Sequence, residues 1–406
     1  MAIKKKVTIL VALGTVVVIG GYLLGGGTLE RLKFTGTLFS GAEQYESFAR
    51  VKEFMPVSKM TAAPVATALP LDLSKGKLPK DFEYDGQRVS TETFLAETDT
   101  SALIIVKNGE MVFEEYWLSG GQQVNWLSMS VAKSFISTAI GIAVDDGLID
   151  INKPVTFYLP SLNGSAYEGV KIKDVLQMSS GAAWNEDYTD PNSDVNRMGQ
   201  SLAFGNPLED FIKDMDREFE PGTVNRYNSA DTQVLGMLLT AATGQPIYQY
   251  MQDKLWDPLG MESNAYWIID DSGMEMAFGG LNATARDYAK LGELMLRKGQ
   301  WNGVQIVSDS WVDQATTPDA PHIQPGVNTE FPLGYGYQWW IPETQEGEYL
   351  AIGVYNQFIY VNPAHNLVVV KLSAYSDYAT SNDESAYREI ESIEFFRAIN
   401  AIYIDI

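Results

Sequence analysis

The stretch WLSMSVAKSFIST, residues 126–138, places two serines and a lysine at the start of an apolar run. This run continues to residue 144, and its valine, phenylalanine, isoleucine and alanine side chains occupy almost every face of a helix. Gly147, in the DDG sequence that follows, is a typical helix stop. The stretch therefore predicts an almost wholly buried helix, with Ser130 and Lys133 at its beginning.

Strand-like sequence lies on both sides of this helix, far apart in the chain. Residues 101–117 form two β-rich runs around Asn108-Gly109, which is a strong hairpin signal. Three further strands are expected near the C-terminus, followed by a helix: 334–342, 349–362, 367–375 and 385–402. The middle of the chain is mainly helical in pattern, with Gly stops after amphipathic segments. We therefore expect an α+β fold, an α/β sandwich, in which an antiparallel sheet built from N- and C-terminal strands is flanked by helices and interrupted by a helical insertion.

Composition excludes several classes of protein. The chain has 406 residues, 45% of them hydrophobic, which is enough for one large domain or two intimate ones. Its formal charge of −23 makes a nucleic-acid partner improbable, because phosphate binding requires clustered cations. The absence of cysteine excludes disulfides and thiolate nucleophiles. His322 and His365 both lie near prolines in turn-like sequence, and neither a metal site nor a cofactor is indicated.

The N-terminus predicts a membrane anchor. Lys4, Lys5 and Lys6 precede an apolar or small-residue run at 7–27, about the length that crosses a bilayer as a helix. We expect residues 1–27 to be a retained signal-anchor of a single-pass cell-membrane protein, with the catalytic domain on the periplasmic or extracellular side. A cleaved signal peptide is the alternative. Residues 28–80 are expected to be a connector, and 81–406 the catalytic domain.

Ser130 and Lys133 are three residues apart, so on a helix they lie on one face about one turn apart. A serine hydroxyl becomes a good nucleophile when a base removes its proton, and a lysine can do so when burial lowers its pKa. The helix N-terminus would also favour a developing oxyanion at Ser130. The alternative is an N-cap serine followed by a solvated lysine, because the S-x-x-K pattern alone is weakly specific.

A second candidate element is PGTVNRYNSADTQVLG, residues 221–236. Pro221-Gly222 predicts a turn, after which Tyr227 and Ser229 stand just before a helix. A lysine ammonium nearby would hold the Tyr227 phenol partly ionised, so that it could pass a proton to a leaving group. The alternative is a packed tyrosine followed by an Asn-Ser cap.

The order and spacing of these motifs resemble the serine hydrolases related to class C β-lactamases and penicillin-binding proteins. Residues 85–400 carry the resemblance, and the segments most like the 6-aminohexanoate-dimer hydrolase and esterase-like branch are DVLQMSSGAAWNEDYTDP (174–191) and QFIYVNP (357–363). LWDPLGME (255–262) and GGLNATARDYAKLGELMLRKGQWNG (279–303) strengthen it. The resemblance implies a β-lactamase/transpeptidase-like fold and a Ser-Lys-Tyr mechanism.

The resemblance also implies a role for each matching residue. Ser130 would be the acylated nucleophile, Lys133 its base and Tyr227 the proton relay to the leaving group. The backbone N–H groups of Ser130 and Val354 would form the oxyanion hole. The implied substrate-binding residues are Tyr188, which falls where the amide-hydrolysing branch has a tyrosine contacting the substrate amide, together with Ser229 and Gly353.

Two positions depart from the family pattern. The third motif, a Lys or His followed by one residue and Gly, is here Ala351-Ile352-Gly353, and Ser229 stands where β-lactamases place asparagine. Loss of the cation argues against β-lactams and peptidoglycan stems, whose carboxylate it helps to hold. A small-molecule ester or linear amide is therefore the expected substrate, and the sequence does not indicate the oligomeric state.

Three alternatives to this expectation stay open. One is a β-lactamase or D,D-peptidase-type enzyme, and another is an inactive relative serving as a cell-envelope binding or sensor domain. The third, a Ser-His-Asp hydrolase, is disfavoured because no G-x-S-x-G occurs and neither histidine has a promising context.

Overall fold

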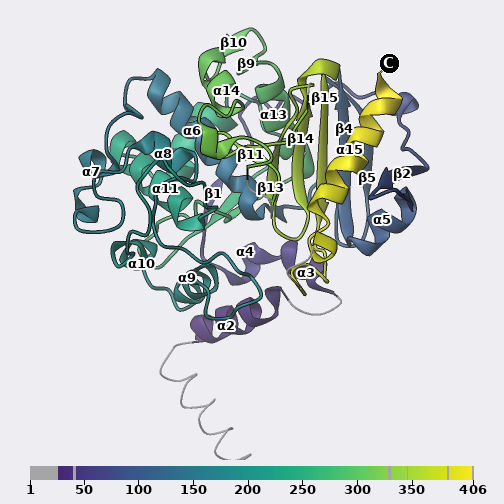
Figure 1. Cartoon of the computed structure of the whole chain (residues 1–406). Coiled ribbons are helices and arrows are strands. Elements are labelled where there is room, and N and C mark those ends of the chain that lie inside the picture. Colours follow the sequence, from purple (N-terminus) through teal and green to yellow (C-terminus); the bar gives the residue numbers. More distant parts are fainter. Residues whose placement is uncertain (1–25, 40–42, 328–330, 345, 382–383, 405–406) are drawn as a thin grey trace, which may run out of the picture.

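The computed structural model describes residues 26–39, 43–327, 331–344, 346–381 and 384–404. Its main sheet is antiparallel throughout, and its first and last strands in the chain lie side by side, as the sequence predicted (Figure 1). In spatial order the sheet comprises β11 (Gly334–Tyr335), β12 (Trp340–Ile341), β13 (Tyr349–Gly353), β14 (Gln357–Asn362), β15 (Leu367–Ser373), β4 (Thr100–Lys107) and β5 (Glu110–Tyr116).

The central strands are buried on both faces, because alternate side chains enter two different cores. On one face, Ile104, Val106 and Val368 join the larger core, against which α13 (Ala285–Leu296) packs. On the other face, Leu103 and Ile105 join a smaller core that includes side chains of α15 (Glu389–Tyr403). The sheet is therefore sandwiched between helices, which confirms the predicted α+β class.

The helical insertion lies beside the sheet and surrounds α6 (Ala132–Asp145) (Figure 1). Twelve of the fourteen residues of α6 are buried, as its all-apolar pattern predicted. The other helices of the insertion are α7 (Val155–Tyr158), α8 (Ile172–Leu176), α9 (Asp194–Ala203), α10 (Leu208–Lys213), α11 (Ser229–Thr243) and α12 (Ile247–Met251), the last continuing as one π-helical turn, Gln252–Trp256. Outside it are α5 (Thr91–Glu97) and α14 (Asp309–Ala315).

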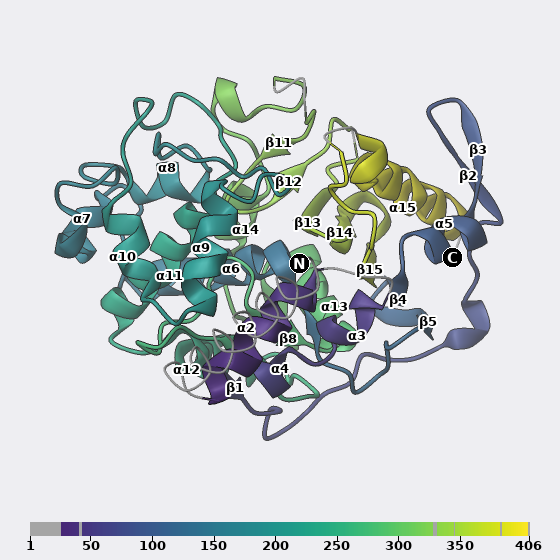
Figure 2. The ribbon, with the colours of Figure 1, turned by 90° about the horizontal axis from the view of Figure 1, so that it is seen from below.

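Part of the expected connector is built into the fold. β1 (Val57–Met60) forms the edge of a second antiparallel sheet, followed in space by β7 (Ala265–Ile268), β8 (Leu281–Ala283) and β6 (Trp126–Leu127). The helices α2 (Gly26–Leu38), α3 (Gln44–Phe48) and α4 (Val51–Phe54) lie across the underside of the molecule (Figure 2). Phe48, Val51 and Met60 are buried in the larger core, which anchors this region. The remaining strands form two hairpins, β2–β3 (Asp81–Tyr84, Gln87–Ser90) and β9–β10 (Gln300–Trp301, Val304–Gln305).

The predicted single-pass membrane location is corrected. Among the described residues, none of the helices combines the length and the apolar character that crossing a bilayer requires. The segment on which the prediction depended, 1–27, lies outside the described residues except for Gly26 and Gly27, which begin α2.

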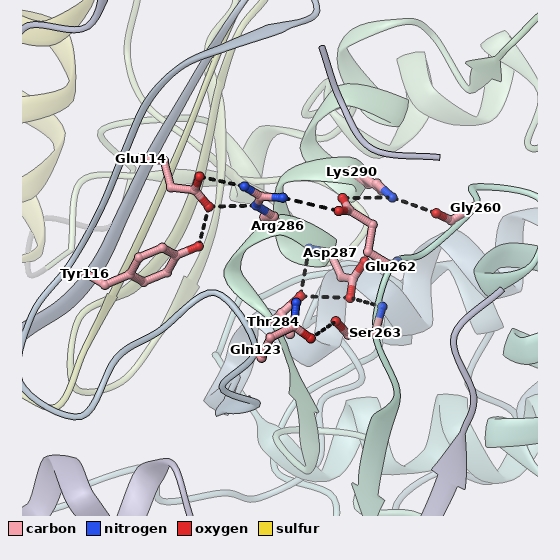
Figure 3. A network of polar contacts seen from close by, with 10 residues as sticks. All are labelled: Glu114, Tyr116, Gln123, Gly260, Glu262, Ser263, Thr284, Arg286, Asp287 and Lys290. Atoms are coloured by element: carbon pink, nitrogen blue, oxygen red, sulfur yellow. Dashed lines mark hydrogen bonds and ion pairs between the residues drawn. The ribbon is translucent and has the colours of Figure 1, made fainter. Parts of the chain in front are cut away.

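A cluster of charged residues ties the main sheet to the loop before β7 (Figure 3). We call it the Arg286 network: Glu114, Glu262, Arg286, Asp287 and Lys290. Arg286 binds both oxygens of Glu114 at 2.7 Å, and its Nη1 lies 3.4 Å from Glu262. Lys290 Nζ lies 3.3 Å from Glu262, and Asp287 accepts the backbone N–H of Glu262 at 2.7 Å. The network therefore fixes α13 against both β5 and this loop.

Candidate active site

Ser130 is positioned by a short strand and a strained turn. β6 pairs with β8, and the next residue, Ser128, donates its N–H to Leu281 O at 2.8 Å. Met129 then takes a φ of 46°, a left-handed conformation that costs a non-glycine residue about 1–2 kcal/mol. The turn Met129–Val131 runs directly into α6, so Ser130 stands at the positive end of that helix.

Lys133 is buried among neutral groups. Its Nζ lies 3.0 Å from Ser130 Oγ and 3.1 Å from Ser229 Oγ, and it donates to Phe278 O at 2.8 Å. The side chain belongs to a residue only 1% exposed, and burial lowers the pKa of Lys133 from 10.5 to about 7 despite the opposing charge of Glu186. Close to neutral pH the amine is therefore partly unprotonated and within reach of the Ser130 proton.

Tyr227 lies in the loop before α11, where Asn228 caps the helix by accepting the N–H of Ala230. Its ring stacks on Trp340, with centroids 5.1 Å apart, and Lys133 Nζ lies 5.1 Å from its centroid. Burial and the charge of Glu186 raise the pKa of Tyr227 well above its usual value, although its contact with Ser130 opposes this. The expectation of a partly ionised phenol is therefore wrong, and Tyr227 carries its proton.

Glu186 joins several of the candidate residues and was not singled out from the sequence. Its carboxylate accepts the hydroxyl and the N–H of Ser229, at 2.6 and 3.0 Å, and the Tyr188 hydroxyl at 2.6 Å. The indole N–H of Trp184 also donates to it. Tyr188, Glu186 and Trp184 are alternate residues of one loop, and no signal in the sequence distinguishes Glu186 from the other carboxylates of this polar loop.

The end of β13 passes directly against the Ser130 turn. A Cβ on Gly353 would come within 2.7 Å of Ser128 O and 3.0 Å of Ser130 N, so only glycine permits this approach. Val354 follows and lines the same cavity as Ser130. Ala351, where the related motif has a cation, lies on β13 and is 1% exposed.

A cavity of about 280 Å³ opens over Ser130. The predicted residues Tyr188, Tyr227 and Val354 line it together with residues that the sequence did not single out, namely Asn225, Phe331, Leu333, Trp340, Ile352, Tyr378, Glu384, Tyr387 and Glu389. Burial raises the pKa of Glu389 to about 8, and Tyr378 donates to its carboxyl at 2.6 Å. The wall around Ser130 is thus aromatic and acidic.

Both histidines are engaged elsewhere. His322 Nε2 lies 3.0 Å from Ser179 Oγ, and His365 Nε2 lies 3.5 Å from Glu346. The residues assembled at Ser130 are instead Lys133, Tyr227, Ser229 and Tyr188, which the sequence had selected from separate segments.

The β-lactamase family model matches residues 92–392 of the chain. Among curated proteins, the 6-aminohexanoate-dimer hydrolase of Paenarthrobacter ureafaciens is 30% identical over 370 residues, which cover 88% of this chain and 91% of the relative. A solved structure from Bacillus anthracis, a provisionally assigned 6-aminohexanoate-dimer hydrolase, matches with a TM-score of 0.78 at 23% identity, covering 91% of this chain and 95% of its own. The structure of EstCE1, described as a hydrolase with promiscuous acyltransferase activity, matches with a TM-score of 0.62 at 17% identity. The match covers 76% of this chain and 96% of EstCE1.

Proposed function

Because the chain belongs to the β-lactamase family, as a hydrolase related to 6-aminohexanoate-dimer hydrolase, we propose that it cleaves amide or ester bonds through an acyl-enzyme on Ser130. The observation that carries the proposal is the Lys133 amine, buried, lowered in pKa to about 7 and 3.0 Å from Ser130 Oγ. A group so placed can act as a general base near neutral pH.

The proposed reaction has two halves. Lys133 takes the proton of Ser130 as Oγ attacks the carbonyl carbon, and the N–H groups of Ser130 and Val354 hold the oxyanion. Tyr227, which carries its proton, donates to the departing nitrogen or oxygen and is reprotonated through Lys133. Water then attacks the acyl group by the same route in reverse, which frees the acid and restores Ser130.

The substrate proposed is an ester or a linear amide without a carboxylate beside the scissile bond. Support comes from Ala351, which cannot pair with a carboxylate, and from the cavity wall, whose described residues include no lysine or arginine that could do so in its place. The aromatic rings of Trp340 and Tyr387 offer apolar surface to an uncharged chain. The name of the P. ureafaciens relative supports a linear amide among these substrates.

A fluorophosphonate probe tests the mechanism, because it labels only an activated serine. We expect the full chain to be labelled and the Ser130→Ala variant to remain unlabelled. Ser128→Ala, two residues away, serves as the matched control and should still be labelled. Absence of Ser130-dependent labelling would favour an inactive binding or sensor domain.

Side-by-side assays test the substrate class. The full chain is incubated with a short-chain aryl ester, a 6-aminohexanoate dimer and a chromogenic cephalosporin. We expect turnover of the ester or the linear amide and at least roughly a hundredfold lower kcat/KM on the cephalosporin. Cephalosporin as the best substrate would contradict the inference drawn from Ala351.

A further inference from the structure

Two of the three partners of Lys133 compete for the free electron pair of its amine. A neutral amine offers two N–H donors and one electron pair. Phe278 O can only accept, so it takes one N–H, at 2.8 Å. The other two partners are the hydroxyls of Ser130 and Ser229, at 3.0 and 3.1 Å, and either hydroxyl can donate or accept. Lys133 activates Ser130 only if Ser229 takes the second N–H.

Glu186 settles this competition by binding the proton of Ser229. Because a carboxylate only accepts, the 2.6 Å contact between Ser229 Oγ and Glu186 Oε1 directs the Ser229 proton away from Lys133. The backbone N–H of Ser229 donates to the other carboxylate oxygen, Glu186 Oε2, at 3.0 Å, so both oxygens of Glu186 are bound to Ser229. Ser229 Oγ is then left with electron pairs facing Lys133 and accepts its second N–H.

Resting on the proposed acyl-enzyme function, we propose that Glu186 is a positioning residue that aims the electron pair of Lys133 at Ser130 by fixing the proton of Ser229. When the Ser130 proton passes to Lys133 Nζ, the Ser130 oxygen bonds to the carbonyl carbon and the carbonyl electrons move to the oxyanion. The new ammonium keeps its bonds to Phe278 O and Ser229 Oγ. Through Ser229 it faces the Glu186 carboxylate, which stabilises the charge.

The surroundings of Glu186 suit this role. The Tyr188 hydroxyl and the Trp184 indole also donate to its carboxylate, so a half-buried side chain on a loop is held by four donors. Its negative charge also raises the pKa of Lys133 against the lowering caused by burial, which keeps the base near the neutral range. Removing the charge alone should therefore move the pH profile, whereas a merely structural side chain would leave it in place.

The decisive experiment is a double-mutant cycle on Glu186 and Ser229, measured as kcat/KM on an aryl ester. In Glu186→Ala the Ser229 proton is free to occupy the electron pair of Lys133, so we expect a loss of roughly a hundredfold, the usual worth of a general base. Ser229→Ala removes an acceptor but no competitor, and about a tenfold loss or less is expected. In the double variant the competitor is gone, so activity should return to about that of Ser229→Ala.

Two outcomes would overturn the proposal: wild-type activity in Glu186→Ala, or additive losses in the double variant. If Glu186→Ala does not fold, Glu186→Gln keeps the shape and removes the charge. Its acid limb should move to lower pH, and an unmoved limb would also count against the proposal. Glu114→Gln, a matched carboxylate that accepts a tyrosine hydroxyl in the Arg286 network, is the control. Labelling of the wild type at Ser130 is measured in parallel, so failure of the parent function is recognised separately.

Discussion

Two buried lysines on two helices of this chain have opposite electrostatic settings. Lys290, on α13, lies 3.3 Å from Glu262 and donates to Gly260 O at 2.7 Å within the Arg286 network (Figure 3). Lys133, on α6, contacts two hydroxyls and a carbonyl, and its nearest described carboxylate partner, Glu186, is reached through Ser229. Burial lowers the pKa of both, but the carboxylates of Asp287 and Glu262 oppose it directly at Lys290. A buried lysine is therefore available as a base where neutral partners replace its counterion.

The largest expected effect separates the two lysines by activity. Lys133→Ala should lower kcat/KM on an aryl ester by roughly 10²–10⁴-fold, because the base is lost while Ser130 stays in place. Lys290→Met should stay within about threefold of wild type, because its contacts are with the network and not the cavity. More than about a hundredth of wild-type activity in Lys133→Ala would refute its role as the base.

Replacing each of the two lysines by methionine should change the free energy of unfolding in opposite directions. A lysine whose folded pKa is about 7 is neutral in the folded chain and charged in the unfolded chain between pH 7 and 10.5. The free energy of unfolding that is lost through this lysine therefore grows as the pH falls from 10.5 to 7. Below pH 7 the loss reaches its full value of about 5 kcal/mol. Lys133→Met removes this cost but also three hydrogen bonds of about 1 kcal/mol each, so the free energy of unfolding should rise by about 2 kcal/mol.

Lys290→Met should instead lower the free energy of unfolding by about 3 kcal/mol, because it removes one of the two cations beside Glu262 and the cation that lowers the pKa of the buried Asp287. Denaturant unfolding at pH 6, where the cost at Lys133 is complete, measures both variants on one scale. A loss of stability in Lys133→Met would mean that its hydrogen bonds outweigh the desolvation of its charge. Lys133 and Lys290 would then both stabilise the folded chain.

The pH dependence of the activity tests Lys133 as the base. Since the proposed base is the neutral amine, kcat/KM should be low below pH 7 and rise through about pH 7, the pKa of Lys133. Asp231, whose pKa burial also raises to about 7, is a second described group that titrates there. Asp231→Asn should keep the acid limb, and loss of the limb in that variant would assign it to Asp231 instead of Lys133.

Much of this fold could be predicted because its signals are local. Helix α6 follows from an uninterrupted apolar run, and the β4–β5 hairpin from Asn108-Gly109, both of which take positive φ. The pairing of β1 with β7 could not be predicted, because four residues at 57–60 carry no distinctive period and their partner lies about 200 residues away. The partner of a strand as short as β1 is decided by the fold of the whole chain and not by the sequence of the strand itself.

The residues of the candidate site also divide into those that a local motif marks and those that only the folded chain reveals. Ser130, Lys133 and Tyr227 stand in recognisable motifs. The structure brings Ser130 and Tyr227 to one cavity wall and places the buried Lys133 amine 3.0 Å from Ser130 Oγ. The Phe278 carbonyl that accepts from Lys133 is a backbone group, which any residue would supply, so no residue type marks it. Glu186 reaches Ser229 across 43 positions, and a carboxylate in a polar loop is ordinary until that contact is known.

The smallest predicted effect compares two tyrosines in matching contacts. Tyr188 donates to Glu186 and Tyr116 donates to Glu114, each at 2.6 Å, but only Tyr188 lines the cavity over Ser130. An amine leaves poorly without a hydrogen-bonding partner, whereas a phenolate leaves readily, so Tyr188→Phe should lower amide hydrolysis by about tenfold and ester hydrolysis by less than about threefold. Tyr116→Phe should leave the ratio of the two rates unchanged. Both variants lose a hydroxyl that is bound to a carboxylate. Equal effects of Tyr188→Phe on amide and ester hydrolysis would therefore make Tyr188 a structural residue like Tyr116. The reason for preferring an amide substrate would then be lost.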